Sequence, residues 1–283
     1  VDEVQDRIYV GAHAGGMMVL HRKSGYIEYY NRHNSNLPSN NIYSIISDGY
    51  GGLWVASLEY LLHFDIDKRN FTIVDVDGDG HKLQQYNRLL FCDSKKRIWA
   101  GGEMGISVFN QVGTSLLPNT DFQIASVLKQ AFVNCFYETS SGYLWIGTRN
   151  GLFALKESDK QFLQYTTENG LPSNVIYGIL EDAYGRLWIS TNQGLSCLNS
   201  ESGKFRNFTI MDGLQGNQFN AGAYCRKDNG YMLFGGVNGI TSFRPETLID
   251  NPYAPKPVIN KLFVHNKEVL PDDETGILKE SIT

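Results

Sequence analysis

Short apolar runs separated by Gly, Asn, Asp or Ser recur along the whole chain. In LPSNVIYGILEDAYGRLWISTNQGLSCLNSESGKFRNFT, residues 171–209, four such runs suit strands: 175–180, 187–191, 195–199 and 205–209. The residues between these runs are those that form turns. Four short antiparallel strands on roughly 40 residues describe one blade of a β-propeller.

The same unit recurs, and it uses every tryptophan of the chain. The aligned positions are Tyr9, Trp54, Trp99, Trp145, Trp188 and Leu233, at successive spacings of 45, 45, 46, 43 and 45 residues. A Gly followed by Leu or Ile recurs downstream of most of them, and LPSN precedes a strand at 37–40 and again at 171–174. Aromatics placed independently in a core would not keep this register, so the spacing predicts a repeat array.

The repeats predict an all-β fold, a β-propeller of four-stranded antiparallel blades. The six visible blades lie near residues 1–36, 37–86, 87–131, 132–170, 171–213 and 214–250. The first lacks a run for its inner strand, the third has a poorly marked outer strand near 122–125, and the sixth has no run for an outer strand before Pro245. Because the leftover strands cannot merge into one closing blade, we expect a ring that either continues beyond these residues or stays open.

The composition changes at residue 251. The run NPYAPKP, residues 251–257, is typical of a linker. Runs at 258–264 and 267–270 then predict a hairpin, followed by a strand at 277–282. Three short strands cannot bury a core alone, so 251–283 is predicted to be a linker and the start of a second all-β domain. The chain also starts with Val, partway through a repeat, and we expect it to be a piece of a longer protein.

Bulk properties exclude some classes of function. The chain has 283 residues, 42% of them hydrophobic, which is enough for a large core. Its net charge of −5 gives no basic footprint, so no contact with nucleic acid is expected. No apolar run reaches the roughly 18 residues that span a membrane. The cysteines have no CxxC spacing, fall in predicted strands of different blades, and are expected to be buried thiols: Cys92, Cys135, Cys197 and Cys225.

The repeat motifs resemble those of a known family. DAYGRLWISTNQGL, SSGYLWIGTRNGL and DGYGGLWVASLEYL, with LPSN before the first strand, resemble the regulator-propeller repeat. The last blade of that family is similar to MDGLQGNQFNAGAYCRKDNGYMLFGGVNGITSFRPETL. The opening of the three-tyrosine domain that follows it, an Ig-like β-sandwich, is similar to PVINKLFVHNKEV. This chain departs from the family pattern where Tyr60 and Lys96 replace glycines and in the degenerate outer strand of its third blade.

In that family the array forms the periplasmic sensor of hybrid two-component systems, typical of Bacteroidetes. Two seven-bladed propellers precede the sandwich domain, a membrane helix and a histidine kinase. The resemblance implies that this chain covers most of the second propeller. It also implies a non-catalytic periplasmic region that binds an oligosaccharide without a cofactor. The resemblance further implies a homodimer through the sandwich domain and the propeller, and a parent protein anchored in the inner membrane that signals to its kinase.

One acidic cluster imitates a calcium site. Asp75, Asp77 and Asp79, followed by Gly80, match the first half of an EF-hand loop. The twelfth position of that loop would be Tyr86, which cannot supply the closing carboxylate. No metal is therefore expected.

Acidic residues also recur six or seven positions before the tryptophans, at Asp48, Asp93, Glu138 and Asp182. Paired carboxylates could serve glycoside hydrolysis. However, the same place in successive blades indicates a structural role in the turn after the inner strand. The histidines form no HxH or HExxH, and neither a nucleophile elbow nor a phosphate loop is present, so no catalytic residue is predicted.

Strand connectivity divides the turns of a propeller between two faces. The first face carries the turns between strands one and two and between strands three and four of each blade. The second face carries the turns between strands two and three and the blade-to-blade crossings. The two residues at the tip of each strand-two-to-three turn vary freely, and they are His13-Ala14, Glu59-Tyr60, Glu103-Met104, Arg149-Asn150, Asn192-Gln193 and Val237-Asn238.

A fixed frame with variable tips is how a repeat scaffold generates recognition. Aromatic and planar polar side chains suit stacking on sugars and hydrogen bonding to them, and the candidate ligand-binding residues are Tyr60, Arg149, Asn192 and Gln193. Taken singly, each of these residues is also what a solvated loop tip contains.

Three functions are compatible with the pattern: a sensor module that binds an oligosaccharide, a propeller lyase or glycosidase, and a protein-interaction scaffold. The proline-rich linker and the start of a sandwich favour the first, because they attach the ring to a downstream region. The absence of a His/carboxylate constellation in the sequence disfavours the second.

We predict that calcium does not bind at Asp75, Asp77 and Asp79, because Tyr86 offers no closing carboxylate. The melting temperature of the protein should be unchanged by a chelator. A melting temperature that falls with the chelator and is restored by added calcium would contradict this.

Overall fold

The computed structural model describes residues 2–4, 6–58, 60–75, 87–156, 161–248 and 261–269. Within these ranges the chain is all-β, as predicted, and its one α-helix is the short α1 (Gln123–Val127). No helix in the described part is long and apolar enough to cross a membrane. The chain divides into two units, Val1–Pro245 and Glu246–Thr283.

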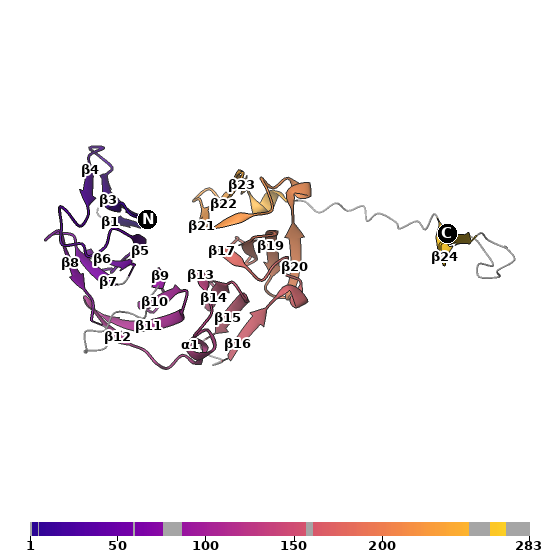
Figure 1. The fold of residues 1–283 in the computed structure, drawn as a ribbon, viewed down its shortest axis with the longest axis horizontal. Helices are drawn as coiled ribbons and strands as arrows, with labels where there is room; N and C mark the ends of the chain where they lie inside the picture. The colour runs from indigo at the N-terminus through magenta and orange to yellow at the C-terminus, as the bar shows by residue number, and fades with distance from the viewer. Residues whose placement is uncertain are drawn as a thin grey trace. The chain divides into compact units, whose positions relative to one another are not determined.

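The first unit is a six-blade β-propeller in which the strands of each sheet follow chain order (Figure 1). Blade 1 contains β1 (Asp2–Val4), β2 (Arg7–Ala12), β3 (Gly16–His21) and β4 (Ile27–Tyr30). Blade 2 contains β5 (Ile42–Ser47), β6 (Gly52–Ser57), β7 (Leu61–Asp65) and β8 (Asn70–Ile73), and blade 3 contains β9 (Asn87–Cys92), β10 (Arg97–Gly102), β11 (Gly105–Val112) and β12 (Ser115–Pro118). Blade 4 contains β13 (Val133–Glu138), β14 (Tyr143–Thr148), β15 (Gly151–Lys156) and β16 (Gln161–Tyr165), and blade 5 contains β17 (Ile176–Glu181), β18 (Leu187–Thr191), β19 (Gly194–Asn199) and β20 (Lys204–Phe208). Blade 6 contains β21 (Phe219–Arg226), β22 (Met232–Gly236) and β23 (Gly239–Phe243).

The aromatic residue on the second strand of each blade packs against the next sheet. Trp54, Trp99, Trp145 and Trp188 are between 0% and 4% exposed. Trp54 shares a core cluster with Ile98 and Ala100 of blade 3, and the other three tryptophans pack likewise against the blade that follows. The predicted register is therefore confirmed, and the core consists of successive layers between neighbouring sheets.

An acidic residue organises the turn between the first and second strands. In blade 5, Asp182 Oδ1 accepts hydrogen bonds from the backbone N–H groups of Tyr184 and Arg186, at 2.9 and 3.0 Å. Its Oδ2 accepts from Arg186 Nε at 2.7 Å and from Trp188 Nε1 at 3.0 Å. Asp93 makes the same set of bonds in blade 3. These carboxylates therefore fix a turn and its tryptophan, which is the structural role predicted for them.

Glu138 does not belong to this set. Thr139 occupies the equivalent place in blade 4, where its Oγ1 accepts from Tyr143 N. The indole N–H of Trp145 is then buried with no partner among the described residues. Glu138 lies one residue earlier and accepts bonds from the N–H and hydroxyl of Ser94 in blade 3. Its alignment with the aspartates was wrong by one residue, and its carboxylate joins two blades.

The LPSN motif closes the crossing between blades. Asn174 Oδ1 accepts from Thr167 N at 2.8 Å, and its backbone carbonyl accepts from Gly151 N at the tip of the preceding blade, also at 2.8 Å. Asn40 and Asn217 make the same pair of bonds in their own crossings. Three of the crossings are thus built on one asparagine that ties each blade to the tip of the one before it.

Two strand predictions were wrong. The first blade does have an inner strand, because β1 pairs with β2 over three residues. The outer strand of blade 3 is β12 at Ser115–Pro118, which follows the long strand β11 and pairs with it in antiparallel orientation. Residues 123–125 instead lie in helix α1. The sequence around both elements lacks a clear apolar alternation, so their pairing depends on the neighbouring strand rather than on local pattern.

Blade 6 is three-stranded, as predicted, and one of its faces is uncovered. Leu195 of blade 5 is 1% exposed because blade 6 packs against it, whereas the equivalent Ile240 of blade 6 is 64% exposed. In the first unit, Figure 1 shows the six sheets side by side in an arc with the first strands on the inner side.

The cysteine prediction was only partly right. The four thiols are free and lie on strands of four different blades, but only Cys135 and Cys197 are buried, while Cys225 is exposed.

In the second unit, β24 (Leu262–Val264) and β25 (Lys267–Val269) form the predicted hairpin, with His265 and Asn266 at positive φ in its turn. The predicted linker and the run at 277–282 lie outside the described residues.

Trp188→Ala should lower the free energy of unfolding by about 3–5 kcal/mol, because it empties a buried position between two sheets and leaves Asp182 one donor short. Denaturant unfolding measures this. Met211→Ala is the control, since Met211 is exposed on the adjacent crossing and its loss should change stability by less than about 0.5 kcal/mol. A loss below about 1 kcal/mol for Trp188→Ala would count against the interblade layer.

Candidate ligand-binding site

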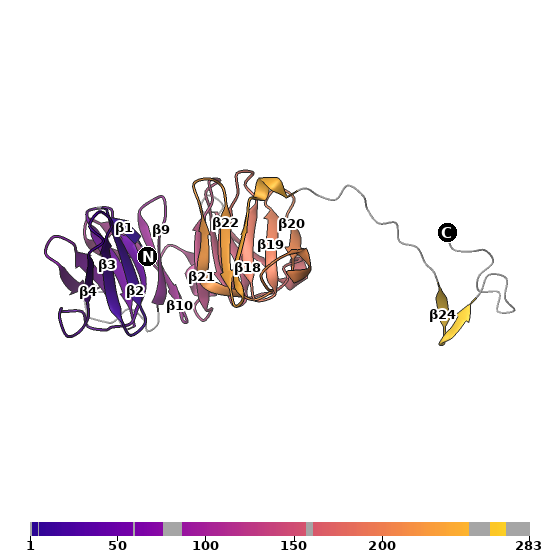
Figure 2. The ribbon, with the colours of Figure 1, turned by 90° about the horizontal axis from the view of Figure 1, so that it is seen from above.

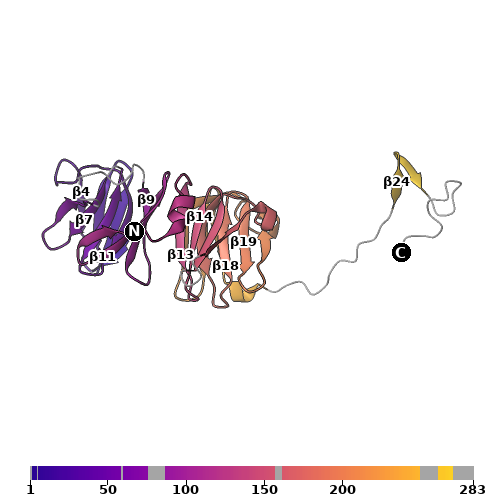
Figure 3. The ribbon, with the colours of Figure 1, turned by 90° about the horizontal axis from the view of Figure 1, so that it is seen from below.

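The strand order confirms how the turns divide between the two faces of the propeller. The turns from second to third strand lie on the same side as the blade crossings, and Figures 2 and 3 show the propeller edge-on with the turns at the two ends of its strands. Backbone bonds join the two kinds of turn on the second face: Arg149 N donates to Phe132 O at 3.0 Å, and Val237 N to Gln218 O at 3.2 Å. The second face is therefore a continuous rim of tips and crossings.

The backbone of each tip is held by a threonine in blades 4 and 5. Thr148 Oγ1 donates to Gly151 O and accepts from Asn150 N, at 2.8 and 2.9 Å. Thr191 does the same with Gly194 and Gln193. The glycine that ends each tip has a positive φ, 117° at Gly151 and 113° at Gly194, which a side chain would strain. These tips are rigid turns whose side chains do not hold the backbone.

The candidate residues differ in how available their side chains are. Arg149 and Gln193 are exposed. The Arg149 guanidinium carbon lies 3.7 Å from the centre of the Phe132 ring, a cation–π contact that orients the guanidinium. Asn192 is half-buried, and its Oδ1 is shielded from solvent with no partner among the described residues. Tyr60 is partly buried and packs against the core between blades 1 and 2.

The structure brings three of these four residues to neighbouring blades. Arg149 lies on the β14–β15 tip of blade 4, and Asn192 and Gln193 lie on the β18–β19 tip of blade 5. Tyr60 belongs to blade 2, on the other side of blade 3. Arg149, Asn192 and Gln193 can therefore contact one ligand, whereas Tyr60 would need a ligand that extends across blade 3.

A second arginine on this rim escaped the sequence reasoning. Arg88, near the start of β9, pairs with the tip residue Glu103, with 2.7 Å between Nη2 and Oε1. Its guanidinium carbon lies 5.1 Å from the Tyr43 ring centre, and the His13 ring is 6.1 Å from that of Tyr43. Glu103 and His13 are tip residues of blades 3 and 1, whereas Arg88 and Tyr43 lie on the inner strands of blades 3 and 2. Only the fold could bring these four together.

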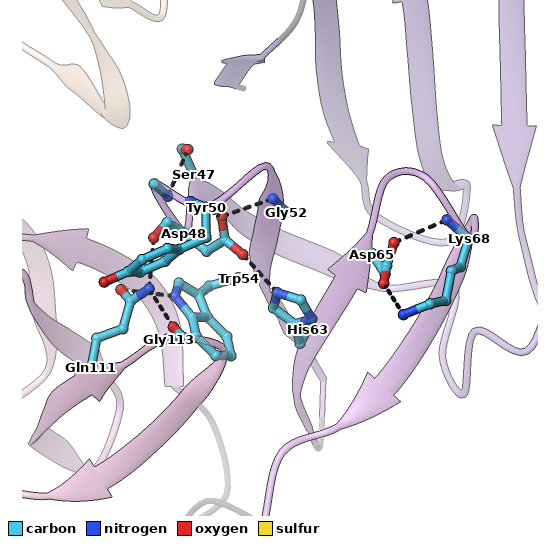
Figure 4. A network of polar contacts seen from close by, with 11 residues as sticks. Ser47, Asp48, Tyr50, Gly52, Trp54, His63, Asp65, Lys68, Gln111 and Gly113 are labelled. Carbon is cyan, nitrogen blue, oxygen red and sulfur yellow. Dashed lines mark hydrogen bonds and ion pairs between the residues drawn. The ribbon is translucent and has the colours of Figure 1, made fainter.

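Blade 2 departs from the common turn network (Figure 4). Asp48 Oδ1 accepts from the N–H groups of Tyr50 and Gly52, as in the other blades, but its Oδ2 is 2.8 Å from His63 Nε2. Trp54 Nε1 donates instead to Gln111 Oε1 of blade 3, at 3.2 Å. Gln111 Nε2 donates in turn to the carbonyl oxygens of Asp48 and Gly113, at 2.6 and 2.9 Å.

The described part has at least three cavities, and the largest of these three lies between blades 2 and 3. Its volume is about 860 Å³, and it is lined by residues of β7, β8 and β12 and their flanking turns, among them His63, Asp65, Asn70, Thr72 and Leu117. The other two, of about 580 and 270 Å³, lie beside the first-to-second-strand turns. The four tip candidates line none of these three cavities.

The described residues show no arrangement for metal or thiol chemistry. No group of three or more His, Cys, Asp or Glu side chains within the described ranges could hold a metal ion. Burial raises the pKa of the Cys135 thiol to about 12 and that of Cys197 to about 11, so both stay protonated at neutral pH and are poor nucleophiles. Of the calcium-like cluster, only Asp75 is described; Asp77, Asp79, Gly80 and Tyr86 lie outside the described residues.

Comparison with known proteins finds a histidine kinase and extracellular domains of hybrid two-component systems among the proteins similar to this chain. A histidine kinase, P4, of Formosa agariphila is 28% identical over 229 residues, which is 78% of this chain and 16% of that protein. The extracellular domain of the hybrid two-component system BT3049 of B. thetaiotaomicron has a TM-score of 0.68 at 20% identity, over 96% of this chain and 43% of that one. The corresponding domain of BT4673 has a TM-score of 0.67 at 19% identity, over 86% and 31%. The chain thus spans less than half of each of these proteins.

The family described as "two component regulator propeller" matches at residues 36–59, 128–150 and 170–193. Each matched segment starts in a blade crossing, runs through the inner and second strands, and ends at a second-face tip of blade 2, 4 or 5. All three segments carry the first-face turn and a tryptophan of the interblade layer, and two of them, 36–59 and 170–193, also carry the crossing asparagine. Three segments of the chain therefore match the repeat of the two component regulator propeller family.

Proposed function

We propose that this chain is the non-catalytic, ligand-sensing part of a two-component sensor kinase, that it lies in the periplasm, and that it binds an oligosaccharide through the second face. The observation that carries the proposal is the division within the repeat. The matched segments run up to and include tip residues, and within this chain the tip pairs differ from blade to blade while the residues of the frame recur. Recognition by variable loops on a repeated frame follows from that division.

The chemistry of the tips on blades 4 and 5 suits a sugar. Arg149 is held flat on Phe132, which leaves the edge of its guanidinium to donate two hydrogen bonds to vicinal hydroxyls or to a uronic carboxylate. Asn192 Oδ1 is an acceptor without a partner in the described part, and Gln193 is an exposed amide beside it. A hydroxyl-rich ligand would satisfy these groups together.

A sensor must also pass on the signal that a ligand is bound. The ligand has to bind one arrangement of propeller, sandwich domain and partner subunit better than another, because a ligand with equal affinity for both shifts nothing. The signal would pass through the segment after residue 250 toward a kinase in the inner-membrane parent protein. A homodimer formed through the sandwich domain and the propeller is part of this proposal, because it gives the two arrangements an interface.

The enzyme alternative has less to support it. Asp48, Asp93 and Asp182 are held in their turns by backbone and side-chain donors, and the thiols of Cys135 and Cys197 stay protonated. A lyase or glycosidase would therefore have to use other groups. We expect no new reducing ends or unsaturated products when the protein is incubated with a panel of oligosaccharides.

Arg149→Ala should weaken binding of an oligosaccharide, identified by a glycan screen of the intact extracellular region, by about 1–3 kcal/mol, because it removes charge-assisted hydrogen bonds. Calorimetry measures the affinity, and the melting temperature should hardly change because Arg149 is exposed. Arg206→Ala is the matched control: Arg206 also lies on an aromatic ring, that of Phe208, but on the outer strand β20.

The proposal fails if Arg149→Ala and a Tyr60→Ala/Asn192→Ala double variant both leave the affinity unchanged. The ligand site would then lie outside the second face of this propeller.

A further inference from the structure

One core position in blade 2 holds a histidine where other blades hold small side chains. The residue of the third strand that pairs with the second-strand aromatic is His63 in blade 2. Its counterparts are Val19, Val108, Ala154 and Cys197, all buried. An imidazole is a costly substitute for a buried aliphatic side chain unless its nitrogens are satisfied. A departure from an otherwise consistent repeat marks a place where function can outweigh packing.

The surrounding network is arranged to keep this histidine in place. Its Nε2 faces Asp48 Oδ2, and a carboxylate oxygen can only accept, so Nε2 carries the proton. Trp54, which would otherwise compete for that oxygen, donates to Gln111 of the next blade. In the neutral ring, Nδ1 is then a hydrogen-bond acceptor, and the described residues provide no partner for it.

His63 lines the large cleft between blades 2 and 3, together with three other polar side chains of the same sheet face. In the strand register His63 lies opposite Thr72, and Asp65 lies opposite Asn70, so the four form a compact patch on β7 and β8. Across the cleft, β12 contributes Leu116 and Pro118, which lie on the face of the sheet that packs toward Trp54 of blade 2. The volume of about 860 Å³ falls within the range of roughly 300–1,000 Å³ typical of small-molecule sites.

The corresponding face of blades 4 and 5 does not combine these features. In blade 4 the same four positions are Ala154, Leu163, Lys156 and Gln161, and in blade 5 they are Cys197, Arg206, Asn199 and Lys204. Blade 2 alone of these three offers two acceptors, the His63 ring and the Asp65 carboxylate, beside the Asn70 amide and the Thr72 hydroxyl. Lys68 neutralises Asp65 at 2.7 Å, which leaves the patch polar with little net charge.

We infer that this cleft is a second binding site, separate from the second-face tips, and that it takes an uncharged, polyhydroxylated ring such as a neutral monosaccharide unit. The hydroxyls of the ring donate to His63 Nδ1 and Asp65 and exchange hydrogen bonds with Asn70 and Thr72. The C–H face of the ring lies against Leu116 and Pro118. A ligand with a free carboxylate or phosphate is disfavoured, because its negative charge would face two hydrogen-bond acceptors, His63 Nδ1 and Asp65, that cannot donate to it.

The test uses the chain of residues 1–283 and the methyl glycosides of glucose, galactose, mannose, xylose and fucose, with glucuronic acid and glucosamine as charged comparators. Saturation-transfer NMR detects binding, and calorimetry gives affinities. Thr72→Trp fills the cleft from an exposed position, so the fold should tolerate it. Leu163→Trp is the matched control, since Leu163 occupies the position of Thr72 in blade 4 and is also exposed.

At least one neutral glycoside should bind saturably, and Thr72→Trp should weaken that binding roughly tenfold or more, whereas Leu163→Trp should leave it within about twofold. Asn70→Ala should weaken it about fivefold, the equivalent of one hydrogen bond. His63→Val, which restores the side chain of blades 1 and 3, should also reduce binding, with the melting temperature measured to separate folding from affinity.

Arg149→Ala should not affect this site, so its result is independent of the function proposed for the tips. The inference is overturned if no neutral glycoside binds saturably, if only a charged sugar binds, or if Thr72→Trp and Leu163→Trp have equal effects.

Discussion

The structure depends on the packing of one aromatic side chain per blade against the sheet that follows. Each of the four tryptophans is closed off from solvent by the next blade, and Tyr9 does the same between blades 1 and 2. A single four-stranded sheet of this length cannot bury enough apolar surface to be stable alone. Stability therefore comes from interfaces between neighbours, as in other repeat arrays. The exposed Ile240 on blade 6 shows what the same position is like when no sheet covers it.

The polar groups complete this frame and decide where variation is possible. In blades 3 and 5 an aspartate of the first-face turn holds the tryptophan indole, and in blades 4 and 5 a threonine holds the tip backbone. Asparagines of three crossings hold the preceding tips. Each group satisfies buried backbone donors and acceptors that would otherwise be costly. Because these residues hold the backbone, the tip side chains of blades 4 and 5 are not needed to hold it. Tyr60 differs, because its side chain takes part in packing.

The sequence predicted the features that recur in the repeats, and it missed strands and contacts that depend on residues far apart in the chain. Blade number, the tryptophan register and the tips followed from periodicity, because each depends on residues close in the chain. The inner strand β1 and the outer strand β12 were missed because each is defined by its partner strand. Glu138 was misassigned because Thr139 replaces the aspartate at the same six-residue distance from Trp145, and Glu138 is the acidic residue next to it. Arg88 with Tyr43, and Trp54 with Gln111, are contacts between residues 45 and 57 positions apart, which no local pattern reveals.

We propose two binding surfaces: the variable tips, and a cleft where His63 of blade 2 replaces the small buried side chain found in other blades. The central claim is that recognition is confined to such positions while the frame stays fixed. Amide hydrogen exchange of the intact extracellular region, with and without a bound oligosaccharide, tests it most directly. The account predicts added protection at tips 149–150 and 192–193 and unchanged exchange at the first-face turns 93–97 and 182–186. Protection confined to the first-face turns, or none anywhere in the propeller, would contradict it.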